Sequence, residues 1–170
     1  GNNAQAEIIG STLNGNDANA IGSGGAIYST FATLSVINST LSGNSATGSV
    51  GGGAIYVNGN TATLTGCTVT GNSMSSATDI AGGGGIQAAN NATVTINNSI
   101  VIGNTATING VDTPSRGDCS IIGSGNYVGN HALTGVATGG PTGGTNLNVS
   151  SAATVLGTTL ANNGGPTQTH

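Results

Sequence analysis

Gly24-Gly25-Ala26-Ile27-Tyr28 returns almost unchanged as Gly52-Gly53-Ala54-Ile55-Tyr56, and a third version, Gly83-Gly84-Gly85-Ile86, follows in the same 170-residue chain. The isoleucine of this segment therefore recurs at nearly equal intervals. The stretches between the copies are rich in Thr, Val, Ser, Asn and Gly, which disfavour helix interiors. A period of about 30 residues built from such stretches predicts a β-solenoid, in which each repeat forms one coil that stacks on the next.

Apolar and polar residues alternate within each repeat. In the segment 32–37 every second residue is Ala, Leu or Val, and Thr, Ser and Ile stand between them. A period of two places the first set on the inner face of a sheet and the second on the outer face. We therefore predict a single all-β domain with 28–32 residues per coil, three short parallel strands per coil and a core without aromatic residues. In the first complete coil these strands are 24–28, 32–36 and 39–43.

Two sets of polar residues recur along the repeats, each at its own position in the coil. A Gly-Asn pair follows the third strand, and asparagine amides stacked at such a bend can hydrogen-bond along the axis. We expect a structural asparagine ladder made of Asn16, Asn44, Asn72 and Asn104. The outward positions, aligned at intervals of 30, predict a Thr/Ser ladder made of Thr33, Ser35, Thr63, Thr65, Thr93 and Thr95.

The repeats and the C-terminal part of the chain differ in character. The repeats extend over residues 1–130, whereas residues 131–170 predict an irregular final coil or a C-terminal arm. Within that part, residues 134–153 are nearly all Gly, Thr, Ala, Asn and Ser, and no strands can be placed in them from the sequence.

The composition excludes several classes of function. Arg116 is the single basic residue apart from two histidines, so the chain cannot neutralise a nucleic-acid backbone or form a polybasic membrane patch. No apolar run approaches the ~20 residues that a membrane-spanning helix needs. At 35% hydrophobic and only 4% charged residues, the chain also lacks the high charge of a disordered segment.

Few residues could carry catalysis or hold a metal. Carboxylates and a base must converge on one face in a polysaccharide-cleaving β-helix. Asp112, Arg116 and Asp118 cluster in the longest insertion, where a loop ion pair or a turn cap is the favoured interpretation and a catalytic pair the alternative. The other carboxylates share no repeat position, and neither His131 nor His170 has ligand-type neighbours. We therefore predict no enzyme activity, no metal and no cofactor. The remaining carboxylates are Glu7, Asp17 and Asp79.

The two cysteines fall in different parts of the repeat. Cys67 lies in the second repeat and Cys119 about two coils later. Two coils span about 9.6 Å, which exceeds the ~7 Å between Cα atoms that a disulfide can bridge. We favour two unpaired thiols.

Both the repeat and the C-terminal residues resemble a known family. The unit Gly-Gly-Ala-Ile…Thr-Leu…Asn-Ser-Thr-Leu-Ser-Gly-Asn resembles the repeats of bacterial right-handed parallel β-helix surface proteins. Asp118-Cys119, Ser124-Gly125-Asn126-Tyr127-Val128-Gly129 and the string from Leu160 to His170 are similar to the C-terminal region of choice-of-anchor Q proteins. The resemblance implies a right-handed parallel β-helix, a secreted or cell-surface bacterial location and no established enzymatic activity.

Two classes of function follow as hypotheses. The first is a structural β-solenoid: a filament subunit, scaffold or adhesin stalk whose subunits stack head to tail, because low charge and open solenoid ends favour self-association. The second is a module that binds glycans or surfaces. Its possible contact residues are Tyr28 and Tyr56, which occupy the same position in successive repeats. Ice binding by the Thr/Ser ladder and polysaccharide cleavage are less favoured alternatives.

Overall fold

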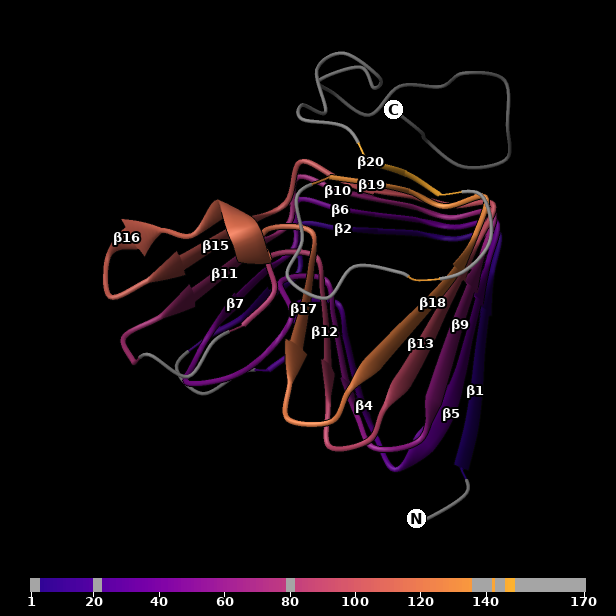
Figure 1. The fold of residues 1–170 in the computed structure, drawn as a ribbon, viewed down its shortest axis with the longest axis horizontal. Helices are drawn as coiled ribbons and strands as arrows, with labels where there is room; N and C mark the ends of the chain where they lie inside the picture. Colours follow the sequence, from indigo (N-terminus) through magenta and orange to yellow (C-terminus); the bar gives the residue numbers. More distant parts are fainter. Residues whose placement is uncertain (1–3, 20–22, 79–81, 136–141, 143–145, 149–170) are drawn as a thin grey trace.

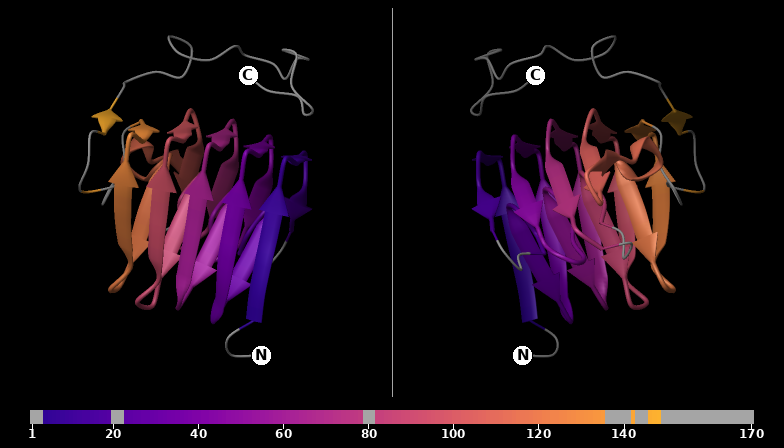
Figure 2. Two further views of the ribbon diagram at one scale, coloured as in Figure 1. Left: turned by 90° about the vertical axis from the view of Figure 1, so that its right-hand side faces the viewer. Right: turned by 90° about the vertical axis from the view of Figure 1, so that its left-hand side faces the viewer.

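The chain folds as an all-β solenoid of about four turns, which Figure 1 shows roughly along its axis in a computed structural model. The structure describes residues 4–19, 23–78, 82–135, 142 and 146–148. In Figure 1 the chain runs anticlockwise around the axis, and Figure 2 shows that successive coils advance towards the viewer of Figure 1. The solenoid is therefore right-handed, as connections between parallel strands almost always are. The predicted fold class is confirmed.

Four sheets run along the solenoid, and we name them A to D. Sheet A contains β1 (Ala4–Ile9), β5 (Ala32–Ile37), β9 (Thr61–Thr65), β13 (Thr93–Asn97) and β18 (Asn126–Asn130). Sheet B contains β2 (Thr12–Asn14), β6 (Thr40–Ser42), β10 (Thr68–Thr70), β14 (Ile100–Ile102), β19 (Leu133–Thr134) and β20 (Leu147–Asn148). Sheet C contains β3 (Asp17–Ala18), β7 (Ser45–Thr47), β11 (Ser73–Ser76), β15 (Thr105–Ile108) and β16 (Val111–Asp112). Sheet D contains β4 (Ile27–Thr30), β8 (Ile55–Asn58), β12 (Ile86–Ala89) and β17 (Cys119–Ile122).

Each complete coil has four strands, so the prediction of three was wrong. The missed strand belongs to sheet C and follows the Gly-Asn pair directly. In the first complete coil Gly43 has φ 62°, which turns the chain at one residue, and β7 begins at Ser45. A Gly-Asn pair is typical of a turn, and the following segment is too short to show a clear alternation.

The core lies between sheets A, B and D. The cluster of buried apolar side chains takes its members from these three sheets and their connections, among them Val36, Leu41 and Ile55. Sheet C contributes none of them, and in Figure 1 it projects away from the other three sheets. The core also contains one aromatic residue, Tyr127 in β18, which is 1% exposed. The expectation of a core without aromatic residues was therefore wrong.

The repeated glycines allow the chain to pass close to its own backbone. A Cβ added at Gly53 would lie 2.0 Å from the carbonyl oxygen of Gly84 and 2.5 Å from that of Ser73 in β11. Gly25 is similarly close to the carbonyl oxygens of Gly53 and Ser45, and Gly84 to that of Thr105. Only glycine fits here, because the segment that leads back from sheet C to sheet D runs directly against the start of the sheet C strands.

Sheet C ends differently from the other sheets at its C-terminal side. After β15 the chain reverses through Asn109 (φ 51°) and Gly110 (φ 76°) and pairs β16 antiparallel to β15. Asn-Gly with two positive φ angles is the favoured sequence of such a tight hairpin turn. The 3₁₀ helix η1 (Pro114–Arg116) follows, so a hairpin instead of another parallel strand covers this edge.

Candidate functional site

The asparagine ladder is the longest polar network among the described residues. The backbone N–H and the side-chain amide of Asn16 both donate to Oδ1 of Asn44, at 3.0 and 2.8 Å. Asn44 donates in the same way to Asn72, and Asn72 to Asn104, at the same two distances. The expected four residues thus form one column, in which each of the first three asparagines donates to the asparagine of the following coil.

The ladder also fastens neighbouring coils to each other. The second amide hydrogen of Asn44 reaches back to the carbonyl oxygen of Leu13, that of Asn72 to Leu41, and that of Asn104 to Val69, at 3.0–3.1 Å. Asn44 and Asn72 are at most 1% exposed. Each buried amide therefore bonds to the coil before it and the coil after it, which ties the coils together along the axis.

A carboxylate ends this ladder. Oδ1 of Asp118 accepts the backbone N–H and the side-chain amide of Asn104 at 3.0 and 2.9 Å, the same pattern that asparagine makes in the earlier coils. Asp118 is 5% exposed, and its burial raises the pKa of the carboxyl group, although hydrogen bonds from Asn104 and from the backbone of Gly135 oppose this shift. Aspartate has no side-chain amide that could donate to a further residue, so the polar ladder ends at Asp118.

The structure gives the two carboxylates of the predicted charge cluster different surroundings. Asp118 is buried at the end of the ladder, whereas Asp112 is exposed in β16. Glu7 lies in β1 and Asp17 in β3, and the carboxylate of Asp17 accepts the hydroxyl of Ser45 at 2.7 Å. Asp79 lies outside the described residues. The favoured interpretation, a loop ion pair or a turn cap, therefore does not describe Asp118, which accepts the last hydrogen bonds of the asparagine ladder.

No metal site emerges from the part of the chain that the structure describes. His131 is exposed and has φ 53°, and His170 lies outside the described residues. No three His, Cys, Asp or Glu residues of the described ranges come close enough to hold a metal ion.

The two cysteines are free and buried. Cys67 occupies a column that the sequence analysis missed, although its spacing equals that of the asparagines. The backbone N–H of Ser11 donates to the hydroxyl of Ser39, and that of Cys67 donates to the hydroxyl of Ser99. Cys67 therefore stands where the other coils have serine. Cys119 instead faces the core from β17, and burial raises the pKa of both thiols.

The Thr/Ser ladder lies on the outer face of sheet A, but its predicted register was wrong. All six residues are half-buried and alternate with more deeply buried apolar residues. The predicted columns do not form. Paired residues of β5 and β9 are separated by fewer residues in the sequence than the predicted interval of 30, and paired residues of β9 and β13 are separated by more. The observed pairs are Ser35 with Thr63, Thr63 with Thr95, Thr61 with Thr93, Ile37 with Thr65, and Thr65 with Asn97.

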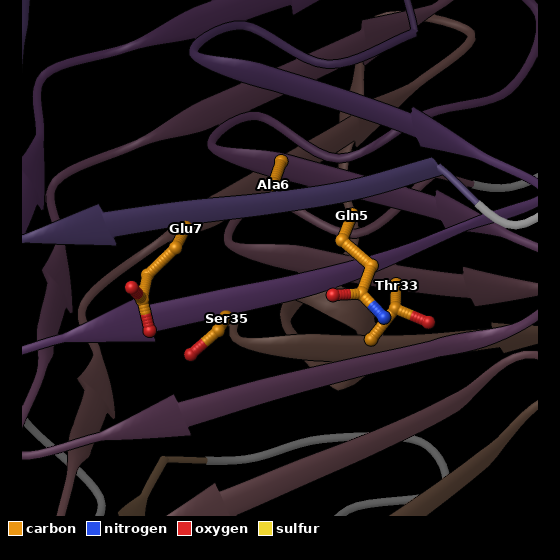
Figure 3. Close-up of a pocket in the computed structure, with 5 residues that line it drawn as sticks. All are labelled: Gln5, Ala6, Glu7, Thr33 and Ser35. Carbon is orange, nitrogen blue, oxygen red and sulfur yellow. The ribbon is translucent and has the colours of Figure 1, made fainter.

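A shallow pocket lies at the N-terminal edge of this face. It has a volume of about 210 Å³ and is lined by Gln5, Ala6, Glu7, Thr33 and Ser35. In Figure 3 four of these side chains point to the same side of β1 and β5, and Ala6 points to the other. Four of its five lining residues are polar, and Glu7 supplies the negative charge.

The two tyrosines considered as surface contacts stack on each other on the outer face of sheet D. Their ring centroids are 5.5 Å apart, with 28° between the ring planes. Tyr28 is 55% exposed, whereas Tyr56 is only 5% exposed. Phe31 is also 55% exposed, just after β4. A ligand could therefore reach Tyr28 and Phe31 but not the ring of Tyr56.

Comparison of the chain with family models, with curated proteins and with solved structures gave no match. The resemblance to choice-of-anchor Q proteins therefore stays a prediction, and the residues from Leu160 to His170 that carry part of it lie outside the described ranges. Within those ranges, no helix is long and apolar enough to cross a membrane.

Proposed function

We propose that this chain is a structural β-solenoid of the bacterial cell surface or extracellular space, a stiff scaffold or stalk that associates end to end. The axial hydrogen-bond network carries the proposal: an unbroken column from Asn16 to Asp118 joins the first four coils in one direction. Such a column, together with four sheets of stacked strands, resists bending because each coil is bonded to the next.

The two ends of the described solenoid differ in their suitability for stacking. At the N-terminal side, β1 is the edge strand of sheet A. Asn16 donates to the ladder but receives no hydrogen bond at Oδ1 from another described residue. At the C-terminal side, β16 covers sheet C and Asp118 ends the ladder. End-to-end contact at that side is therefore expected at the edge strands of sheets B and D, β20 and β17, rather than through the ladder, because Thr142 already bridges to Val128 of sheet A.

Electron microscopy of the purified chain at neutral pH, with light scattering over a concentration series, tests this function. The expected result is rods that lengthen with concentration.

A matched pair of variants locates the contact. By the alternation of a parallel ladder, the N–H of Glu7 points away from β5, because Gly10 donates to Ile37. Glu7→Pro should therefore abolish lengthening through the β1 edge, and Glu7→Thr should preserve it. Short rods of constant length at every concentration would contradict the proposal.

A second candidate function is the binding of surface glycans. The supporting observation is the exposed ring of Tyr28, stacked on Tyr56, because aromatic faces are common sugar platforms at binding sites. Affinity electrophoresis through a panel of polysaccharides tests it. Retardation of the native chain that is lost in Tyr28→Ala supports the candidate. Equal mobility of the two proteins in every gel rejects it.

A further inference from the structure

One column on the outer face of sheet D changes from aromatic to polar along the axis. Tyr28 pairs with Tyr56, Tyr56 with Gln87, and Gln87 with Ser120, in neighbouring strands of the sheet. Gln87 is 0% exposed and Ser120 is 1% exposed. A long amide side chain and a hydroxyl group therefore lie in adjacent positions about 4.8 Å apart on one buried face.

These two side chains are unpartnered. Both amide atoms of Gln87 and the hydroxyl of Ser120 are buried without a hydrogen bond, and they are the only buried side-chain polar atoms in that condition among the described residues. The contrast with the ladder is clear, because the buried amides of Asn72 and Asn104 are fully bonded. Each buried polar atom left unpaired lowers the stability of the fold, and an ordered water molecule is a common partner for such atoms.

The backbone of glycine residues, which have no side chains, covers Gln87 and Ser120. A Cβ added at Gly52 would lie 3.1 Å from the backbone nitrogen of Gln87, and one added at Gly83 would lie 3.2 Å from the Cβ of Ser120. The Gly-rich segments 51–53 and 82–85 therefore close over the column. Side-chain size in this column also decreases from Tyr56 to Gln87 to Ser120.

We propose that Gln87 and Ser120 hold a bound water molecule between sheet D and the Gly-rich segments. The water donates to Oε1 of Gln87 and accepts from Nε2 of Gln87 or the hydroxyl of Ser120, which meets the two to four polar partners that a buried water needs. A site of this kind replaces the tyrosine stack in the later coils.

Two measurements test the site, and the first uses the unmodified protein. Water–protein NOE spectroscopy should show a long-lived water near the side-chain amide of Gln87 and the backbone amide of Ser120. The absence of such a signal, with the Gln87 amide resonances assigned, would overturn the proposal. This experiment does not depend on any variant being able to fold.

The second measurement uses the sign of a stability change. If water satisfies Gln87, Gln87→Met leaves Ser120 unpaired and lowers the thermal midpoint by about 2–6 °C. If the site is dry, the same change removes unpaired polar atoms and raises the midpoint, which would overturn the proposal. Gln5→Met, at an exposed position of β1, controls for the general effect of this substitution in a strand. Gln87→Met combined with Ser120→Ala should recover part of the loss, because neither partner is then left unpaired.

Discussion

Asp118 accepts the backbone and side-chain N–H groups of Asn104 with one carboxylate oxygen, at 3.0 and 2.9 Å, and so takes the place of the next asparagine in the axial ladder. Asp118 comes from a different point of the coil than the asparagines. It lies 14 residues after Asn104, whereas successive asparagines of the ladder are 28 or 32 residues apart. A buried carboxylate that terminates a neutral ladder makes the stability of this end of the solenoid dependent on pH.

The first prediction concerns that dependence. Burial raises the pKa of Asp118 above its ordinary value of 3.8. The folded state therefore favours the protonated carboxyl group, and the contribution of this residue to stability is greatest below pH 3.8. It decreases as the pH rises from there to the pKa of the folded state, and is constant above it. The free energy of unfolding, measured by denaturant titration at several pH values, should show this decrease in the native chain and lack it in Asp118→Asn. Parallel pH profiles for the two proteins would contradict the assignment.

The second prediction concerns the middle of the ladder. Asn72→Ala removes an amide that is 1% exposed and leaves both donors of Asn44 without their acceptor, whereas Oδ1 of Asn104 keeps the backbone N–H of residue 72 and loses only the side-chain donor. We expect a loss of about 2–4 kcal/mol in the free energy of unfolding. Asn16→Ala, at the exposed end of the ladder, is the matched control and should cost under about 1 kcal/mol. Denaturant titration compares the two variants, and equal losses would show that the ladder contributes little beyond local turn geometry.

The third prediction separates the two thiols. Cys67→Ser places serine where Ser39 and Ser99 stand in the neighbouring coils, and the new hydroxyl can donate to the carbonyl oxygen of Thr65 as the thiol does. Its effect on the free energy of unfolding should be within about 1 kcal/mol. Cys119→Ser instead introduces a hydroxyl into the apolar core beside Ile86 and should cost about 1–3 kcal/mol.

Thermal and chemical denaturation of both cysteine variants check this order. A larger loss for Cys67→Ser than for Cys119→Ser would contradict the assignment of Cys67 to the serine column.

The fourth prediction concerns the glycines of the repeat. In Gly53→Ala the new Cβ meets two backbone carbonyl oxygens, at 2.0 and 2.5 Å, which no side-chain movement can relieve. A loss of about 3 kcal/mol or more is expected. Gly15→Ala is the control: it has φ 68° but no atom within 4 Å of the added Cβ, so only backbone strain of about 1–2 kcal/mol remains. Circular dichroism melting curves compare the two, and a Gly53→Ala variant as stable as Gly15→Ala would disprove the close approach.

Much of the fold was predictable from local repetition. The alternation in 32–37 identifies the inner and outer faces of sheet A, because side chains in a strand alternate with a period of two whatever the strand pairs with. The even spacing of Asn16, Asn44 and Asn72 likewise identifies one column, because equal offsets bring identical residues to the same point of successive coils. The serine column with Cys67 has the same spacing and could have been found in the same way.

Tertiary structure alone decided the rest. The lengthening of the coil after β9 determines which threonines become neighbours, and strand pairing decides where the extra residues are accommodated. Thr63 therefore lies beside Ser35 and Thr95 rather than beside Thr33 and Thr93. Asp118 has no repeat position that reveals its role. Tyr127 pairs with the inward Val94, but it replaces the aliphatic residues that earlier coils have at this position. A repeated sequence specifies what successive coils share, whereas the residues that differ acquire their function only from the neighbours that folding brings to them.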